Sequence, residues 1–113
     1  MTEMNWSGEL PMAITVCDTH GTIVYMNEKS KTTFSNDGGG DLVGKNLFDC
    51  HSLSSVKKIK QLLKTKSSNI YTIKKNAIKK MIIQTPWFQK DSLMGLVEIS
   101  IELPENIPHF DRD

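Results

Sequence analysis

The sequence predicts a small α+β domain in which helices cover one face of a single antiparallel sheet. Segments with the alternating, β-branched character of strands stand at both ends of the chain, and helical patterns lie between them. The last three strand-like segments, 69–75, 77–85 and 93–102, are joined by links too short for a parallel crossover. The order strand, strand, helices and three strands therefore favours one five-stranded sheet.

The first two strands are expected to form a hairpin. Residues 12–17 are rich in β-branched side chains, and residues 22–26 repeat that character. Between them, Asp18 and Gly21 occupy the first and fourth positions of a tight turn. This spacing brings the two segments side by side as antiparallel neighbours.

Short helical elements are expected next. Asn27 fits the N-cap of a helix over residues 28–34, because its side chain can accept a hydrogen bond from the first turn. Three glycines predict an irregular, mobile loop at 35–40. Val43, Leu47 and Phe48 are expected to form a single helical turn over the core.

A longer amphipathic helix follows, with Ser54 or Ser55 as its expected N-cap. At 100° per residue its apolar side chains share one arc and its lysines share another. The inward set is Val56, Ile59, Leu62 and Leu63, and the basic set is Lys57, Lys60 and Lys64. In the last strand, alternation places Val97, Ile99 and Ile101 on the face opposite Glu98, Ser100 and Glu102.

With 113 residues the chain has the length of one domain. We expect an N-terminal cap at 1–12, the domain at 13–103 and a tail at 104–113. Apolar runs are too short for a membrane-spanning helix, and the N-terminus does not resemble a secretory signal. The expected location is the cytoplasm.

Charge is distributed unevenly, although the formal net charge is only +1. The segment 50–90 contains ten lysines and no acidic residue. A basic face of this kind suits an acidic partner. Nucleic acid is not favoured, because Arg112 is the chain's one arginine and bidentate base or phosphate contacts need this residue type.

Two motifs carry a resemblance to a known family. The first is Asp18-x-x-Gly21-x-Ile23-Val24-Tyr25-x-Asn27, and the second is Leu42-Val43-Gly44-Lys45-Asn46-Leu47-Phe48. Together with the element order, they resemble a PAS domain over about residues 13–103. The resemblance implies the strand order 2-1-5-4-3 and a ligand cavity between the sheet and the helices. It also implies a role in sensing and signal transduction, often as a dimer.

From this resemblance we expect a sensory module that binds a small ligand or a protein partner. It would regulate a downstream signalling or transcriptional output through a separate effector protein. The alternative is a cofactor-free dimerisation domain whose basic face meets an acidic partner or nucleic acid. In either case we expect a homodimer. Met4, Trp6 and Leu10 are expected to form part of a helical or extended cap that packs on the sheet or on a second subunit.

The family's known cofactors are tested by their motifs. Flavin photosensors carry the run Asn-Cys-Arg-Phe-Leu-Gln, which this sequence lacks, so flavin is not expected. The p-coumarate photosensors hold their chromophore with a Tyr and a Glu, but these positions correspond here to Met26 and Ser30, so p-coumarate is not expected either. Haem-binding members use a histidine on or near the long helix, which makes His51 the candidate haem ligand.

The candidate pocket residues combine these positions with the expected core of the sheet. They are His51, Cys50, Met26, Phe48, Ile59, Met81, Ile83 and Val97. No metal site is expected apart from an iron held by His51, because the two cysteines lie in no metal-binding spacing. An enzyme is not expected, since the adjacent residues Asp49, Cys50 and His51 point in different directions.

Overall fold

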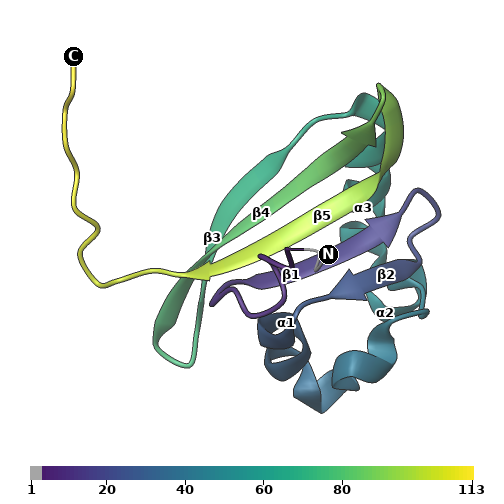
Figure 1. Ribbon diagram of the computed structural model, residues 1–113, viewed down its shortest axis with the longest axis horizontal. Helices are drawn as coiled ribbons and strands as arrows, with labels where there is room; N and C mark the ends of the chain where they lie inside the picture. Colours follow the sequence, from purple (N-terminus) through teal and green to yellow (C-terminus); the bar gives the residue numbers. More distant parts are fainter. Residues whose placement is uncertain (1–3) are drawn as a thin grey trace.

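The computed structural model describes residues 4–113, apart from the side chain of Cys50. Five antiparallel strands form one sheet in the order β2-β1-β5-β4-β3, which confirms the predicted topology (Figure 1). The strands are β1 (Ala13–Asp18), β2 (Ile23–Met26), β3 (Asn69–Lys75), β4 (Ile78–Gln89) and β5 (Ser92–Glu102). The helices are α1 (Glu28–Thr33), α2 (Leu47–Cys50) and α3 (Leu53–Thr65), with 3-10 turns η1 (Ser35–Asp37) and η2 (Gly39–Leu42).

The helical segments lie together on one side of the sheet, which we call the inner face. In Figure 1 α3 passes behind β4 and β5, and α1 and α2 lie beside β1 and β2. The predicted apolar face of α3 is buried, and Ile59, Leu62 and Leu63 join Cys17 and Leu96 of the sheet in one core cluster. The burial of this apolar stripe holds the helical layer against the strands. None of the helices in residues 4–113 is long and apolar enough to span a membrane.

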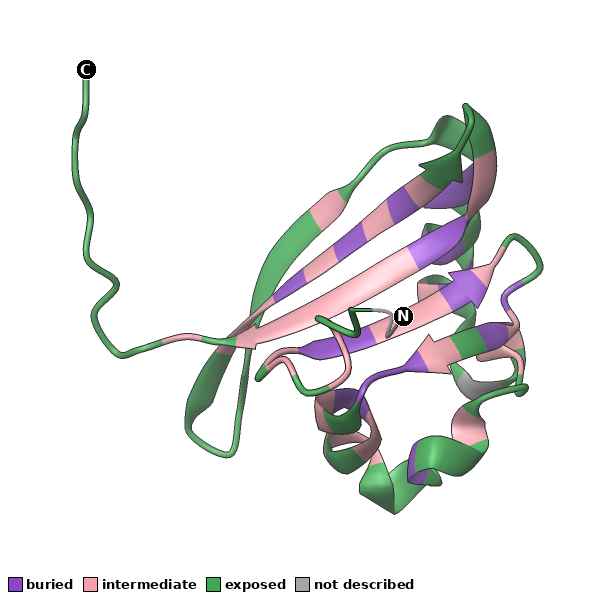
Figure 2. Cartoon of the chain, in the orientation of Figure 1, coloured by how far each residue is buried: buried purple, intermediate pink, exposed green. Residues whose placement is uncertain are grey.

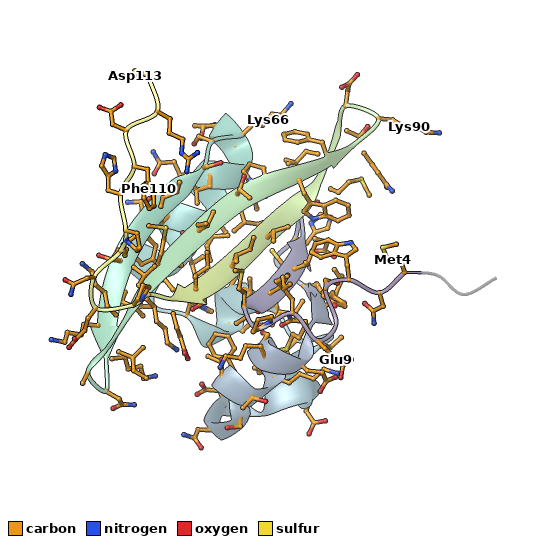
Figure 3. The ribbon with its side chains drawn as sticks, turned by 60° about the vertical axis from the view of Figure 1, so that its left-hand side comes forward. Met4, Glu9, Lys66, Lys90, Phe110 and Asp113 are labelled. Carbon is orange, nitrogen blue, oxygen red and sulfur yellow. The ribbon has the colours of Figure 1, made fainter. Side chains whose placement is uncertain are left out.

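The opposite, outer face of the sheet is covered in part by the N-terminal segment. This segment crosses in front of β1 in Figure 1, and the Ser7 hydroxyl hydrogen-bonds the Tyr25 hydroxyl at 2.8 Å. Residues 1–3 of the predicted cap lie outside the described residues. At the other end of the chain the tail extends away from the sheet in Figure 1, and Figure 3 labels Phe110 and Asp113 on it.

Asn27 joins the N-terminal segment, β1 and α1 through one buried amide that is 1% exposed. Its Oδ1 accepts hydrogen bonds from the backbone N–H groups of Ile14 (2.9 Å) and Ser30 (3.0 Å). Its Nδ2 donates to the backbone oxygens of Ser7 (2.9 Å) and Met12 (2.8 Å). The predicted N-cap is confirmed, and the same side chain also makes hydrogen bonds to backbone groups of β1 and of the N-terminal segment.

The two family motifs meet at the β1–β2 hairpin. Asp18 Oδ1 accepts hydrogen bonds from the backbone N–H groups of His20 (2.9 Å) and Thr22 (3.0 Å), which closes the turn. Gly21 has a φ of +85°, and a Cβ there would lie 2.8 Å from the Phe48 ring. Asn46 Nδ2 in turn donates to the His20 carbonyl oxygen at 2.9 Å. The second motif therefore holds the hairpin turn against the start of α2.

Three local predictions were wrong. The glycine-rich segment at 35–40, predicted to be an irregular loop, forms η1 and η2, because Gly38 and Gly39 adopt positive φ angles that reverse the chain between two short turns. Val43 precedes the helical turn rather than joining it, since α2 begins at Leu47. The N-cap of α3 is Ser52, whose Oγ accepts the N–H of Ser55, rather than Ser54 or Ser55.

Replacing Asn27 with alanine should lower the free energy of unfolding by about 3 kcal/mol or more, because buried donors and acceptors lose their partners. Urea denaturation followed by circular dichroism measures the change. Asn36→Ala, at an exposed position in η1, is the matched control and should shift stability by less than about 0.5 kcal/mol. Equal losses in the two variants would contradict the role assigned to Asn27.

Candidate functional site

A cavity of about 360 Å³ lies between the inner face of the sheet and the helical layer. Such a volume lies within the range of about 300–1,000 Å³ that is typical of small-molecule sites. Its lining combines apolar walls with a few polar groups, as ligand sites do. The lining residues are Thr15, Cys17, Ile23, Met26, Phe34, Asp37, Leu42, Leu47, His51, Ile59, Leu96 and Glu98.

A second, more open hollow of about 380 Å³ continues from the cavity toward β3 and β4. Both hollows are lined by Phe34, His51, Ile59 and Glu98, so Glu98 stands at their junction. Lysines from α3, β3 and β4 also line the second hollow; they are Lys58, Lys75 and Lys80.

A row of polar side chains crosses the inner face from β1 to β3. Cross-strand pairing places Thr15 opposite Glu98, Glu98 opposite Gln84, and Gln84 opposite Asn69. Directly paired residues of an antiparallel sheet share one face. The four side chains therefore form a continuous polar row within a face that otherwise packs against helices.

Hydrogen bonds orient this row toward Glu98. Asn69 Nδ2 donates to Gln84 Oε1 at 3.1 Å, and Gln84 Nε2 donates to Glu98 Oε2 at 3.0 Å. Thr15 Oγ1 is paired instead with the Ser30 hydroxyl of α1 at 2.6 Å. The amide of Gln84 thus has a fixed direction, and it holds one oxygen of the carboxylate in place.

The negative charge of Glu98 affects two neighbouring acids. Burial raises the pKa of the Cys17 thiol, and the carboxylates of Asp18 and Glu98 raise it further. Burial also raises the pKa of the Tyr71 phenol, with Glu98 as the second cause. Cys17 is therefore a protonated, buried free thiol at neutral pH and a poor nucleophile.

His51 lies between α2 and α3 and lines the cavity, although its side chain is exposed. Its Nδ1 lies 3.0 Å from the Leu47 carbonyl oxygen. A proton on Nδ1 would be donated to this oxygen and would leave Nε2 as the free ring nitrogen.

The structure brings three of the sequence-predicted pocket residues to the cavity: Met26, Ile59 and His51. Phe48 packs against the core cluster and the hairpin turn, with Lys60 Nζ 4.9 Å from the centre of its ring. The Cys50 side chain lies outside the described residues. Contact of any of these residues with a ligand stays a prediction.

Placing Met81, Ile83 and Val97 in the pocket was wrong. Their cross-strand partners put them on the outer face of the sheet, away from the helices. The alternation in β5 was identified correctly, but its two faces were exchanged: Glu98 and Ser100 point to the helical side. The error came from assuming that the more apolar face of a strand must meet the helices.

Sequence reasoning missed Thr15, Asp37, Gln84 and Glu98 as residues of the hollows. The period-2 pattern alone could have placed Glu98 beside Thr15 and Gln84 on one face, once the strand order was known. No such signal marks Asp37, which reaches the cavity from η1. Among the residues that the structure describes, no group of three or more side chains of His, Cys, Asp and Glu is arranged to hold a metal ion.

The family model described as PAS fold matches residues 8–65, which is just over half of the chain. The chain therefore belongs to the PAS family, as the two motifs predicted. No curated protein matches the sequence.

Solved structures show the same fold at low sequence identity. A sensory box sensor histidine kinase from Vibrio cholerae aligns with a TM-score of 0.65 and 17% identity, over 85% of each chain. The Aer2 receptor of V. cholerae, described as a dual PAS-haem oxygen sensor, gives 0.61 and 12% identity over 82% of this chain and 95% of that one. VqmA of V. cholerae gives 0.67 and 14% identity over 87% of this chain but only 50% of its own length.

Stability should fall as the pH rises above about 8.5, the ordinary pKa of a thiol. Above this pH the unfolded chain releases the Cys17 proton while the folded chain retains it, so the folded state binds more protons and loses stability with each pH increment. Urea unfolding between pH 7.5 and 10 measures the slope. Cys17→Ala should make the slope shallower, and an unchanged slope would contradict this assignment.

Proposed function

We propose that this PAS domain is a non-catalytic sensory module that binds a compact organic ligand in the cavity and regulates a signalling or transcriptional partner. The main observation that supports this proposal is the cavity itself. Its apolar walls meet a polar row whose direction is fixed by the bonds from Asn69 to Gln84 and from Gln84 to Glu98. A fixed polar group inside an apolar cavity suits the selection of one ligand orientation.

The similar structures support a sensory role. They include a sensor histidine kinase, the Aer2 oxygen sensor and VqmA, a LuxR-type receptor described with a target DNA. Another structure shows VqmA bound to DPO, at a TM-score of 0.66 and 15% identity. Two proteins of similar fold are thus described with different ligands, haem in Aer2 and DPO in VqmA.

Haem is the second candidate ligand, and the orientation of His51 favours it. Nδ1 faces the Leu47 carbonyl oxygen, and a histidine that holds iron normally donates its other ring N–H in this way. The rest of the site fits haem poorly. The cavity is small, and the carboxylates of Asp37 and Glu98 line it, where they would repel the propionates of a haem. We therefore propose a smaller ligand.

Native mass spectrometry and a visible absorption spectrum of freshly purified, untagged protein test the proposal. We expect a small bound mass and no Soret band. Leu42→Trp should remove the bound mass by filling the cavity, because Leu42 lines it. Val43→Trp is the matched control, since Val43 is exposed and should leave the ligand bound.

Two results would contradict this proposal. A bound mass that is unchanged in Leu42→Trp would place the ligand elsewhere. A sharp Soret band that disappears in His51→Ala would identify haem as the ligand and His51 as the residue that holds its iron.

We further propose that a second copy of the chain covers the outer face. The centre of this face carries half-buried apolar side chains, Met81, Ile83, Val97, Ile99 and Ile101, and Figure 2 shows intermediate burial along much of β5. Met4 and Trp6 add exposed apolar surface from the N-terminal segment beside it. An apolar patch that the chain's own elements leave uncovered favours a protein partner. Since one patch can face the same patch of a second copy about a two-fold axis, this surface can pair with itself.

Ile99→Glu should shift the protein toward monomer by at least about tenfold in dissociation constant, because a carboxylate would be desolvated at the centre of the interface. Light scattering over a concentration series measures the mass. Val43→Glu, on the helical side, is the control and should leave it unchanged. Truncation at Pro11 is less suitable, since it removes the Ser7 and Gly8 backbone partners of Asn27 and Glu28. A mass that is unaffected by Ile99→Glu would exclude this face.

A further inference from the structure

Glu98 gives the cavity a negative charge for which the surrounding protein provides no fixed cation. The two ion pairs within residues 4–113 join Lys29 to Glu102 and Lys31 to Glu28, and neither involves Glu98. Asp37, an exposed residue, is a second carboxylate in the same lining; the lining includes no lysine or arginine, and His51 is its one basic side chain. A carboxylate at an apolar cavity is costly unless a partner compensates its charge.

The hydrogen bonds around Glu98 leave it as an acceptor. Gln84 Nε2 donates to Oε2 at 3.0 Å, and it is the one hydrogen bond to this carboxylate that the structure shows within residues 4–113. Gln84 cannot turn its oxygen toward Glu98 without losing the bond that Asn69 Nδ2 donates to it. Thr15, directly opposite Glu98, is engaged by Ser30. A ligand that meets this group must therefore bring N–H or O–H donors.

The neighbouring acids support the same conclusion. Burial is the main cause of the raised pKa of both Cys17 and Tyr71, and the charge of Glu98 contributes to each. Cys17 lies on β1 and Tyr71 on β3, on opposite sides of Glu98 in the strand order. Neither group can supply a cation. Glu98 also lines the second hollow, with Lys58 of α3, Lys75 of β3 and Lys80 of β4. Within residues 4–113 none of these lysines forms an ion pair with Glu98, and none lines the cavity itself.

The apolar walls of the cavity determine the chemistry of the part of the ligand that does not contact Glu98. Apolar surface makes up most of the lining, contributed among others by Met26, Phe34, Leu47, Ile59 and Leu96. A volume of about 360 Å³ accommodates a molecule with one or two rings or a branched aliphatic chain. The lining is therefore apolar over most of its surface, and Glu98 and Asp37 give it a negative charge.

We infer that the cavity selects a compact organic cation, in which an apolar body carries a protonated amine or amidine whose N–H groups bind Glu98. This inference rests on the proposed function, since it identifies the class of ligand for the same cavity. A charge-assisted hydrogen bond to a carboxylate is stronger than a neutral one, and in a partly dry cavity the difference is retained.

Three probes of nearly equal shape separate charge from size: benzamidinium, benzamide and benzoate. Calorimetry on the wild-type protein should show benzamidinium binding at least about tenfold more tightly than benzamide, with benzoate the weakest, as expected for a hydrogen bond to a charged group. Glu98→Gln should lose this preference, because the amide keeps the shape and removes the charge. Glu102→Gln, on the same strand and paired with Lys29 at the sheet's end, is the matched control and should retain it.

Each of the other outcomes overturns the inference. Equal or tighter binding of benzamide would show that the cavity takes neutral ligands, and it would leave the proposed function standing. A preference for benzamidinium that survives in Glu98→Gln would place the recognition at another group. If none of the probes binds, the cavity does not accept compact aromatic cations, and the comparison of Leu42→Trp with Val43→Trp then decides separately whether it binds any ligand. A thermal melt of Glu98→Gln shows whether it is folded, and the wild-type series alone can overturn the inference if it is not.

Discussion

The buried amide of Asn27 is the interaction on which the other parts of the fold depend. One side chain satisfies backbone groups of the N-terminal segment, of β1 and of α1, so that three segments meet at a single point. Two of these segments lie on opposite sides of the sheet: the N-terminal segment on the outer face and α1 on the inner face. Because a buried amide is stable only with all its partners, these segments must order together. Asn27 thereby connects the surface proposed for dimerisation with the wall of the cavity.

The distribution of polarity between the two faces of the sheet is unusual for a small domain. The inner face, which packs against helices, carries Thr15, Gln84 and Glu98, while the centre of the outer face carries Val97, Ile99 and Ile101. A domain selected only for stability would place these sets the other way, because burying polar groups costs free energy and exposing apolar ones gains none. The proposed function explains both departures: a bound ligand would compensate the inner polar row, and a second subunit would cover the outer apolar face.

Much of the fold could be predicted from the sequence because its signals are local. The turn residues Asp18 and Gly21, the N-cap Asn27 and the apolar stripe of α3 each determine an element within a few residues. The site could not be predicted in the same way. Period-2 alternation shows that Val97 and Glu98 lie on opposite faces, but not which face meets the helices. The polar row depends on the register of four strands that are distant in sequence. The position of Asp37 in the cavity lining depends on the 3-10 turns, which the glycine-rich segment was not expected to form.

Alternation within β1 and β5 also provides a short route between the two proposed sites. Thr15 and Glu98 contact the cavity, and their sequence neighbours Val16 and Val97 lie on the outer face, directly paired with each other. A ligand that draws Glu98 inward moves the same backbone that carries Val97 and Ile99, so no longer chain of contacts is required. Coupling of this kind is reciprocal: if ligand binding changes dimer affinity, dimerisation must change ligand affinity by the same factor. A second route runs through side-chain hydrogen bonds: Thr15 is bonded to Ser30 of α1, and Asn27 bonds α1 to the N-terminal segment. The cavity and the outer face are therefore linked twice, and a ligand that affects only one of these links would still affect the proposed dimer surface.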